Sequence, residues 1–204
     1  MYNPSGLDAP LSTTLTTARL VLSPSRAGDV GAIRTALRKN RVHLTPWQPK
    51  TTGDPTSLSS VTASITRDRK LWRAGTQFAF WVFEAERPDV VVGRVSLSGV
   101  WRSAYHGAYL GYWVDGECNG RGFATEAVAA VLAFAFGPLG LHRVQAAIMP
   151  NNLASLRVIE KLGFRREGFA QRYLQIAGKW EDHVLFAMLS DELPGGTGDV
   201  DFAI

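Results

Sequence analysis

The chain of 204 residues contains a single cysteine, Cys118. Because a disulfide needs two cysteines, a small fold held together by internal disulfides is excluded. Cysteine and histidine do not cluster at the spacing of a zinc site, so we expect no metal. The sequence also lacks an apolar run long enough to span a bilayer and an N-terminal signal peptide with a basic start and an apolar block. These absences favour a soluble, cytoplasmic protein that does not bind membranes.

Charge of one sign is not concentrated anywhere in the chain. The formal net charge is +4 and the isoelectric point is about 9.5. Lys and Arg are scattered, without the dense block of a nucleic-acid-binding arm. We therefore expect no direct contact with nucleic acid, and the mild positive balance suits an anionic small ligand.

The sequence has no Pro-, Gly- or Ser-rich linker between two apolar regions, no internal repeat and no low-complexity segment. With 46% hydrophobic residues, the chain can bury a substantial core. We predict one domain over residues 15–191, preceded by a flexible segment at 1–14 and followed by a flexible tail at 192–204.

Strand-like and helix-like segments alternate along this domain. Apolar stripes predict helices between the strands, and runs of β-forming residues predict strands near 19–23, 77–85, 90–100, 108–114, 141–149, 164–176 and 181–189. This order predicts an α/β fold with a mixed sheet and helices on both of its faces.

The most informative segment is Asn119-Gly-Arg-Gly-Phe-Ala124, between a strand-like and a helix-like run. Its two glycines leave room for a ligand against the main chain. Successive amides at a helix N-terminus can form an anion site, so a phosphate or pyrophosphate is the expected occupant. The spacing is neither that of a P-loop nor that of the dinucleotide fingerprint. A plain strand-to-helix turn explains this segment, taken alone, equally well.

A second segment, Asn152-Leu-Ala-Ser155, opens another helix-like run that Glu160-Lys-Leu-Gly-Phe164 closes. Asn152 suits a helix N-cap and Gly163 suits a C-cap. With the glycine loop before it, this order of motifs resembles the GNAT superfamily of acetyl-CoA-dependent N-acetyltransferases. Thr17–Leu22, Leu110–Val114 and Gly178–Asp182 resemble the RimJ/RimL branch, which acetylates the N-termini of ribosomal proteins.

The resemblance spans roughly residues 15–191 and implies a GNAT-like fold. In that fold, a mixed and largely antiparallel sheet of about seven strands holds acetyl-CoA between two splayed parallel strands, here 108–114 and 141–149. Asn119 stands where the family usually has Gln or Arg. The implied cofactor-binding residues are Trp113, Val114, Asn119, Gly120, Arg121, Gly122, Phe123, Ala124, Thr125, Asn152 and Ser155.

The resemblance implies Ser155 as the catalytic hydroxyl beside the leaving thiolate, because the tyrosine that many members use one turn later is replaced by Ile159. The alternative is a helix serine bonded to its own backbone. No carboxylate stands where the family often has its general base. Glu84 and Tyr109 are the first candidates for this role, and His106 and Asp182 are further candidates. His142 and His183 are interpreted as structural.

The predicted activity is direct acetyl transfer to a primary amine, most of all the N-terminal α-amine of a ribosomal protein. Such an amine titrates near pH 8, so a base is less necessary than for lysine. The alternatives are acetylation of a small amine, such as an amino acid, a polyamine or an aminoglycoside, and a non-catalytic CoA sensor. Five aromatic residues, whose other role is packing, can line the acceptor pocket: Trp47, Trp101, Tyr105, Tyr173 and Trp180. A homodimer is compatible with the sequence.

Overall fold

The computed structural model describes residues 9–193 and 201–203. Within them, one sheet of nine strands runs in the order β7-β8-β6-β5-β4-β3-β2-β1-β9. The strands are β1 Thr14–Thr16, β2 Leu20–Pro24, β3 Gln77–Glu84, β4 Arg87–Trp101, β5 Gly107–Val114, β6 Arg143–Ile148, β7 Arg165–Ile176, β8 Lys179–Leu189 and β9 Asp201–Ala203. The α-helices are α1 Val30–Lys39, α2 Arg41–Leu44, α3 Leu58–Arg73, α4 Phe123–Phe136 and α5 Leu153–Lys161.

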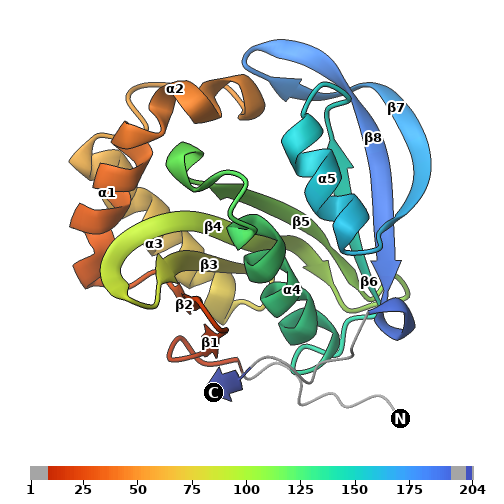
Figure 1. The fold of residues 1–204 in the computed structure, drawn as a ribbon, viewed down its shortest axis with the longest axis horizontal. Coiled ribbons are helices and arrows are strands. Elements are labelled where there is room, and N and C mark those ends of the chain that lie inside the picture. Colours follow the sequence, from red (N-terminus) through yellow and green to blue (C-terminus); the bar gives the residue numbers. More distant parts are fainter. Residues whose placement is uncertain (1–8, 194–200, 204) are drawn as a thin grey trace.

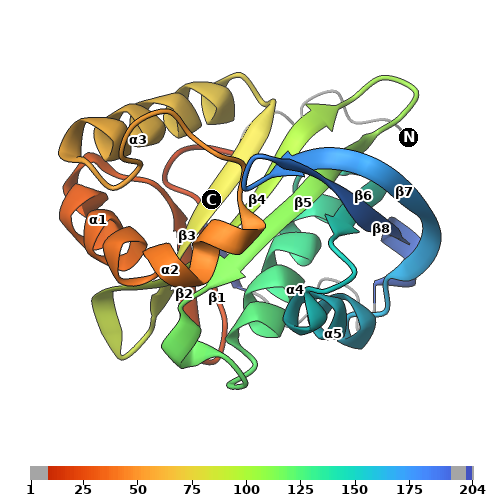
Figure 2. The same cartoon turned by 90° about the horizontal axis from the view of Figure 1, so that it is seen from above.

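Helices cover both faces of the sheet, as the sequence predicts. Figure 2 shows the strands between α1 and α3 on one side and α4 and α5 on the other. β3 is buried along almost its whole length because alternate side chains enter two cores. Phe78 and Phe80 pack toward α4, whereas Trp81 and Phe83 pack toward α1 and α3.

The sheet is antiparallel except at β5 and β6, which run side by side in the same direction. This parallel pair lies in the middle of the molecule, with α5 beside it (Figure 1). The predicted fold class, a mixed and largely antiparallel sheet with one parallel pair, is confirmed. Two further strands, β1 and β9, bring the described sheet from about seven strands to nine.

β1 and the edge strand β9 overlap the segments expected to be flexible. β1 pairs with β9 in antiparallel register, with Leu15 opposite Phe202, so parts of both expected tails belong to the sheet. Leu15 is fully buried, which explains why this short strand is held in place. The rest of the expected tails at 1–8, 194–200 and 204 lies outside the described residues.

α4 is apolar around its whole circumference, which is typical of a helix buried on all sides. Its Phe134 lies against a group of aromatic rings, including Trp72 from α3, with ring centroids 6.2 Å apart, and Phe80 from β3, at 5.2 Å. The burial of α4 fixes the position of its N-terminus, which carries the Asn119–Ala124 loop.

Candidate functional site

β5 and β6 separate after three residue pairs. Their register runs from Gly107 opposite Arg143 to Tyr109 opposite Gln145 and then stops. β5 nevertheless continues to Val114 alongside β4, and β6 continues to Ile148 alongside β8. The strands therefore splay, as predicted, and leave a wedge that opens toward the glycine loop.

The main chain of β5 presents alternate residues to this wedge. The amide of Asp115 donates to the carbonyl of Val92 at 2.8 Å, and Trp113 lies opposite Arg94. Since main-chain groups alternate between neighbours in an antiparallel pair, those of Trp113 turn to β4. Those of Tyr112 and Val114 face the wedge. Of the two residues predicted to bind through their main chain, Val114 therefore faces the wedge and Trp113 does not, whereas Tyr112 does.

Two connected lobes occupy the wedge. The first, here called the loop lobe, has a volume of about 600 Å³ and lies between the glycine loop, α5 and the loop after α2. The second, the strand lobe, measures about 520 Å³ and lies over β4, β5 and the end of β6. Tyr112, Asn152 and Ser155 line both lobes and mark their junction.

The loop lobe contains every residue predicted to bind a cofactor except Arg121. Gly122 stands before the first turn of α4 with φ +82°, a left-handed backbone that glycine adopts without strain. The first amides of a helix have no partner inside the helix. Within the described chain, no acceptor takes the amides of Gly120, Gly122, Ala124 and Thr125.

Two cations that the sequence interpretation missed also line the loop lobe. Arg157 and Lys161 lie one turn apart on α5, and neither forms an ion pair within the described residues. No Asp or Glu lines this lobe. In the sequence, these two cations could have been recognised by their i, i+4 spacing on the helix that follows Asn152, which places both on one helix face. The lobe therefore combines orphan amides with unpaired cations and fits a polyanion.

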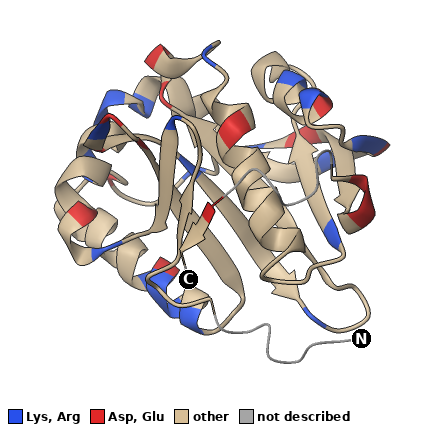
Figure 3. Ribbon diagram, turned by 60° about the horizontal axis from the view of Figure 1, so that its bottom comes forward, with Lys and Arg blue, Asp and Glu red and all other residues tan. Residues whose placement is uncertain are grey.

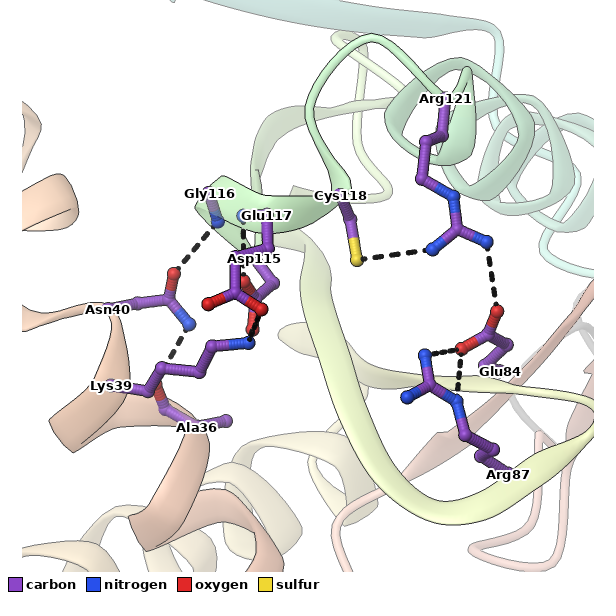
Figure 4. Close-up of polar contacts among 10 residues, drawn as sticks. All are labelled: Ala36, Lys39, Asn40, Glu84, Arg87, Asp115, Gly116, Glu117, Cys118 and Arg121. Atoms are coloured by element: carbon purple, nitrogen blue, oxygen red, sulfur yellow. Dashed lines mark hydrogen bonds and ion pairs between the residues drawn. The ribbon is translucent and has the colours of Figure 1, made fainter.

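A network of charged side chains anchors the glycine loop from outside the lobes (Figure 4). Arg121 extends away from the loop lobe to Glu84, at 3.0 Å, and its guanidinium lies 4.3 Å above the ring of Phe123. Glu84 also accepts hydrogen bonds from Arg87. The bonds from Arg87, and then that from Arg121, hold the pKa of Glu84 below its usual range.

This geometry corrects the prediction for Glu84. Its carboxylate lines neither lobe and is engaged by two guanidinium groups, so it does not reach the wedge as a base. Arg19, directly before β2, supports the same loop by donating to the carbonyl of Arg121 at 2.9 Å and to Glu126 at 2.7 Å.

The other end of the loop is fixed to α1. Lys39 lies 2.9 Å from Asp115 and 2.8 Å from Glu117, and Asn40 accepts from the amide of Gly116 at 2.9 Å. Burial alone would raise the pKa of Asp115, but hydrogen bonds from Lys39 and from the Glu117 amide lower it below its ordinary value. Helix α1 therefore helps to position the loop.

Ser155 and Asn152 occupy the first turn of α5. Asn152 is its N-cap, as predicted, because its side chain accepts from the amide of Ser155 at 3.1 Å. The hydroxyl of Ser155 has no hydrogen-bond partner in the described chain. The alternative of a serine bonded to its own backbone is therefore not supported, and this hydroxyl is available at the junction of the lobes.

Tyr112 contacts Ser155 from β5. Its hydroxyl donates to the carbonyl of Ser155 at 2.9 Å, and burial raises its pKa well above the ordinary value. Tyr109, predicted as a catalytic candidate, lines neither lobe and stacks on Tyr105 with centroids 6.5 Å apart. The structure thus brings Tyr112 to the wedge and leaves Tyr109 outside it.

His183 is a second residue whose position the sequence interpretation missed. It is 3% exposed, yet it lines the strand lobe from within β8. The other candidates are elsewhere: His106 and Asp182 line neither lobe, and Asp182 accepts from the amide of Arg172 at 2.8 Å. His142 is exposed at the far end of β6.

The strand lobe is roofed by a contact between two distant segments. Trp47 lines both lobes, and the carbonyl of the next residue, Gln48, accepts from the amide of Ala177 at the tip of the β7–β8 hairpin, at 2.9 Å. Trp101 and Trp180 are 61% and 62% exposed. Of the five aromatic residues considered for the acceptor pocket, only Trp47 lines a lobe.

Charge on the rest of the described molecule is mixed. Basic and acidic positions are interspersed over the ribbon in Figure 3, and the described residues contain no group of His, Cys, Asp and Glu that could hold a metal. No helix in the described ranges is long and apolar enough to cross a membrane. A groove of about 930 Å³ along α3 is lined by that helix alone, so it is a helix surface and not a second cleft.

Known proteins match this arrangement. The family model of the acetyltransferase (GNAT) domain matches residues 19–165. The [Ribosomal protein uS5]-alanine N-acetyltransferase of Escherichia coli is 32% identical over 182 residues, which cover 89% of this chain and 93% of that protein. The probable N-acetyltransferase YjcK of Bacillus subtilis is 41% identical over 128 residues, or 63% of this chain and 70% of that protein.

Among solved structures, that of Mycobacterium smegmatis RimJ in complex with CoA-disulfide superimposes with a TM-score of 0.85. Its sequence is 30% identical, and the match covers 95% of this chain and 98% of that one. With the splayed strands, the glycine loop and the matching family model in agreement, the chain belongs to the GNAT acetyltransferase family and is an acyltransferase of the RimJ/RimL type.

Proposed function

We propose that this enzyme transfers acetyl from acetyl-CoA to the N-terminal α-amine of a ribosomal protein. The observation that carries the proposal is the wedge between β5 and β6, with orphan amides at one end and Ser155 at the junction of its two lobes. Similarity to the E. coli uS5-alanine enzyme over 89% of the chain supports the class of acceptor.

The residues of the loop lobe fit acetyl-CoA. The amides of Gly120, Gly122, Ala124 and Thr125 receive phosphate oxygens, and the N-terminus of α4 adds partial positive charge. Arg157 and Lys161 supply full positive charges in the same lobe. Main-chain groups of Tyr112 and Val114 meet the amide-bearing arm of the cofactor. When bound, acetyl-CoA supplies an activated acetyl thioester.

Ser155 is the hydroxyl that serves the departing sulfur. Its Oγ has no partner in the described chain, so it can donate a hydrogen bond or a proton at the junction of the lobes. A main-chain amide of β5 facing the wedge stabilises charge that develops on the acetyl oxygen. The two lobes hold the amine and the thioester in one geometry, which contributes much of the rate.

The strand lobe suits a peptide N-terminus better than a polyamine. Its charged lining residues are Arg67 and Arg94, and no Asp or Glu lines it. A polycation would meet like charge there, without a compensating carboxylate. This charge favours an α-amine acceptor over spermidine-like amines.

A thiol-release assay tests the proposal with acetyl-CoA and a panel of ribosomal-protein N-terminal peptides, amino acids, polyamines and aminoglycosides. We expect turnover on peptides and a loss of about 100-fold in Ser155→Ala, the scale of one proton-transfer group. Ser64→Ala, another partly buried helical serine outside both lobes, is the matched control. Turnover on small amines alone contradicts the acceptor class, and CoA binding without any turnover indicates a sensor.

A further inference from the structure

The strand lobe contains one buried imidazole and no carboxylate. Its titratable lining residues are Arg67, Arg94, Tyr112 and His183. Arginine stays protonated in proteins and cannot accept a proton. Arg94 is also engaged with the buried Asp68 at 2.9 Å. The hydroxyl of Tyr112 already donates to the Ser155 carbonyl. By elimination, His183 is the only proton acceptor among these side chains.

The contacts of His183 fix which ring nitrogen accepts. Nδ1 lies 3.0 Å from the carbonyl oxygen of Glu181, and a carbonyl oxygen can only accept, so Nδ1 carries the hydrogen. In the neutral ring, Nε2 is then the acceptor. Nε2 has no partner in the described chain and is not among its fully buried, unsatisfied polar atoms, so it meets the lobe.

The ring is also held in place by packing. Tyr173 from β7 contacts it edge-to-face, with centroids 5.8 Å apart. The residue opposite His183, Ala170, is part of the same hairpin, whose tip bonds to Gln48. A histidine with a fixed tautomer, a fixed ring plane and a free Nε2 in a cleft is arranged as a general base. The charged and titratable groups that face it from neighbouring elements are Arg67, Arg94, Tyr112 and Tyr173.

We propose that His183 is the general base that deprotonates the acceptor amine. The inference rests on the proposed function, which assigns no general base, and names the residue for that role. A proton passes from the ammonium nitrogen to Nε2, which frees the nitrogen lone pair. As the C–N bond forms and the C–S bond breaks, the second nitrogen proton goes to the leaving sulfur beside Ser155. His183 then releases its proton to water.

The first test compares pH profiles of kcat/KM for the wild-type enzyme, His183→Gln and His142→Gln. We expect the wild-type rate to fall on the acid side, as the base becomes protonated. His183→Gln should lose about 100-fold near neutral pH and should fall as the acceptor amine itself, with a pKa of about 8, becomes protonated. His142→Gln, at an exposed position outside the lobes, should match the wild type. A pH profile in His183→Gln with the same shape as that of the wild-type enzyme overturns the proposal, whether the rate falls or not.

The second test needs no turnover and no stable variant. Nitrogen-detected NMR of the wild-type protein reports the tautomer of His183, and titration with an acceptor peptide reports contact with Nε2. The proposal requires a neutral ring protonated at Nδ1 and a peptide-dependent shift of Nε2. A neutral ring protonated at Nε2 contradicts the proposal, and so does an Nε2 resonance that does not shift at a saturating peptide concentration. A wild-type enzyme that is idle on every amine refutes the proposed function instead, so the two failures are distinguishable.

Discussion

At the scale of single residues, Glu84 shows how strongly position determines a role. As a carboxylate late on a strand, it was a reasonable candidate base. In the fold it lies at the outer end of β3, pairs with Arg87 and Arg121, and is only 8% exposed. Glu84 holds the glycine loop through these ion pairs. Arg121 takes part in the same contact, so its side chain does not face the loop lobe.

The loop anchor should make stability depend on pH. The pKa of Glu84 is lowered in the folded state, so its ion pairs stabilise the fold fully above the ordinary glutamate range and are lost as the pH falls through the lowered value. The unfolding free energies of the wild-type protein and Glu84→Gln should differ most near neutrality. The two curves should converge as the pH falls below the ordinary glutamate pKa of about 4.3.

Urea unfolding across this pH range checks the prediction, with Glu160→Gln as a control because Glu160 is exposed and forms no ion pair within the described chain. A difference that stays constant well below the ordinary glutamate pKa of about 4.3 would mean that the charge of Glu84 does not hold the loop.

Residues tied to a local motif could be predicted from the sequence. Asn152, Ser155 and Gly122 belong to helix starts, where a few neighbouring positions determine the geometry. His183 and Tyr112 could not be predicted in this way, because their placement depends on which strands splay and on which face of a strand a side chain lies. Those facts come from pairing between distant segments.

At the scale of elements, α4 is the support on which the loop depends. Its buried side chains belong to one hydrophobic core, and Phe134 lies at the centre of an aromatic group with Trp72, Phe78 and Phe80. Its apolar composition predicted a helix, but only the fold shows that every side of it is covered.

Removing the central ring should therefore destabilise the whole domain. Phe134→Ala leaves a cavity in a fully buried site and should lower the unfolding free energy by about 3–5 kcal/mol. Phe136→Ala, on the same helix at a partly buried position, should lower it clearly less. Urea unfolding measures the unfolding free energy of both variants. Equal losses would show that the central ring stabilises the fold no more than the partly buried ring of Phe136 does.

The ends of the elements were predicted less well than their existence. β8 begins at Lys179, two residues earlier than expected, because the hairpin turns over Ala177 and Gly178 alone, both with positive φ. Such two-residue turns match the twist of the strands that they join. The short strands β1 and β9 were missed because each has three residues and is recognisable only through its partner.

At the scale of the whole molecule, the site arises from topology. One parallel pair inside an antiparallel sheet creates the splay, α4 brings the orphan amides to one end, and α5 brings Ser155 to the junction. The hairpin β7–β8 and the loop after α2 close the roof. The order of motifs in the sequence predicted this arrangement, because the glycine loop and the Asn152 helix each follow one of the two splayed strands.

The central claim is that the wedge binds CoA through the loop after β5, and calorimetric titration with CoA tests it most directly. Wild-type protein should bind, and Gly122→Glu should weaken binding at least about tenfold. The reason is that a side chain at φ +82° strains the loop and a carboxylate repels phosphate at an anion site. Gly140→Glu, with φ +60° in the turn after α4 and outside both lobes, carries the same strain and charge and should bind like the wild type. Unchanged affinity in folded Gly122→Glu would contradict the account.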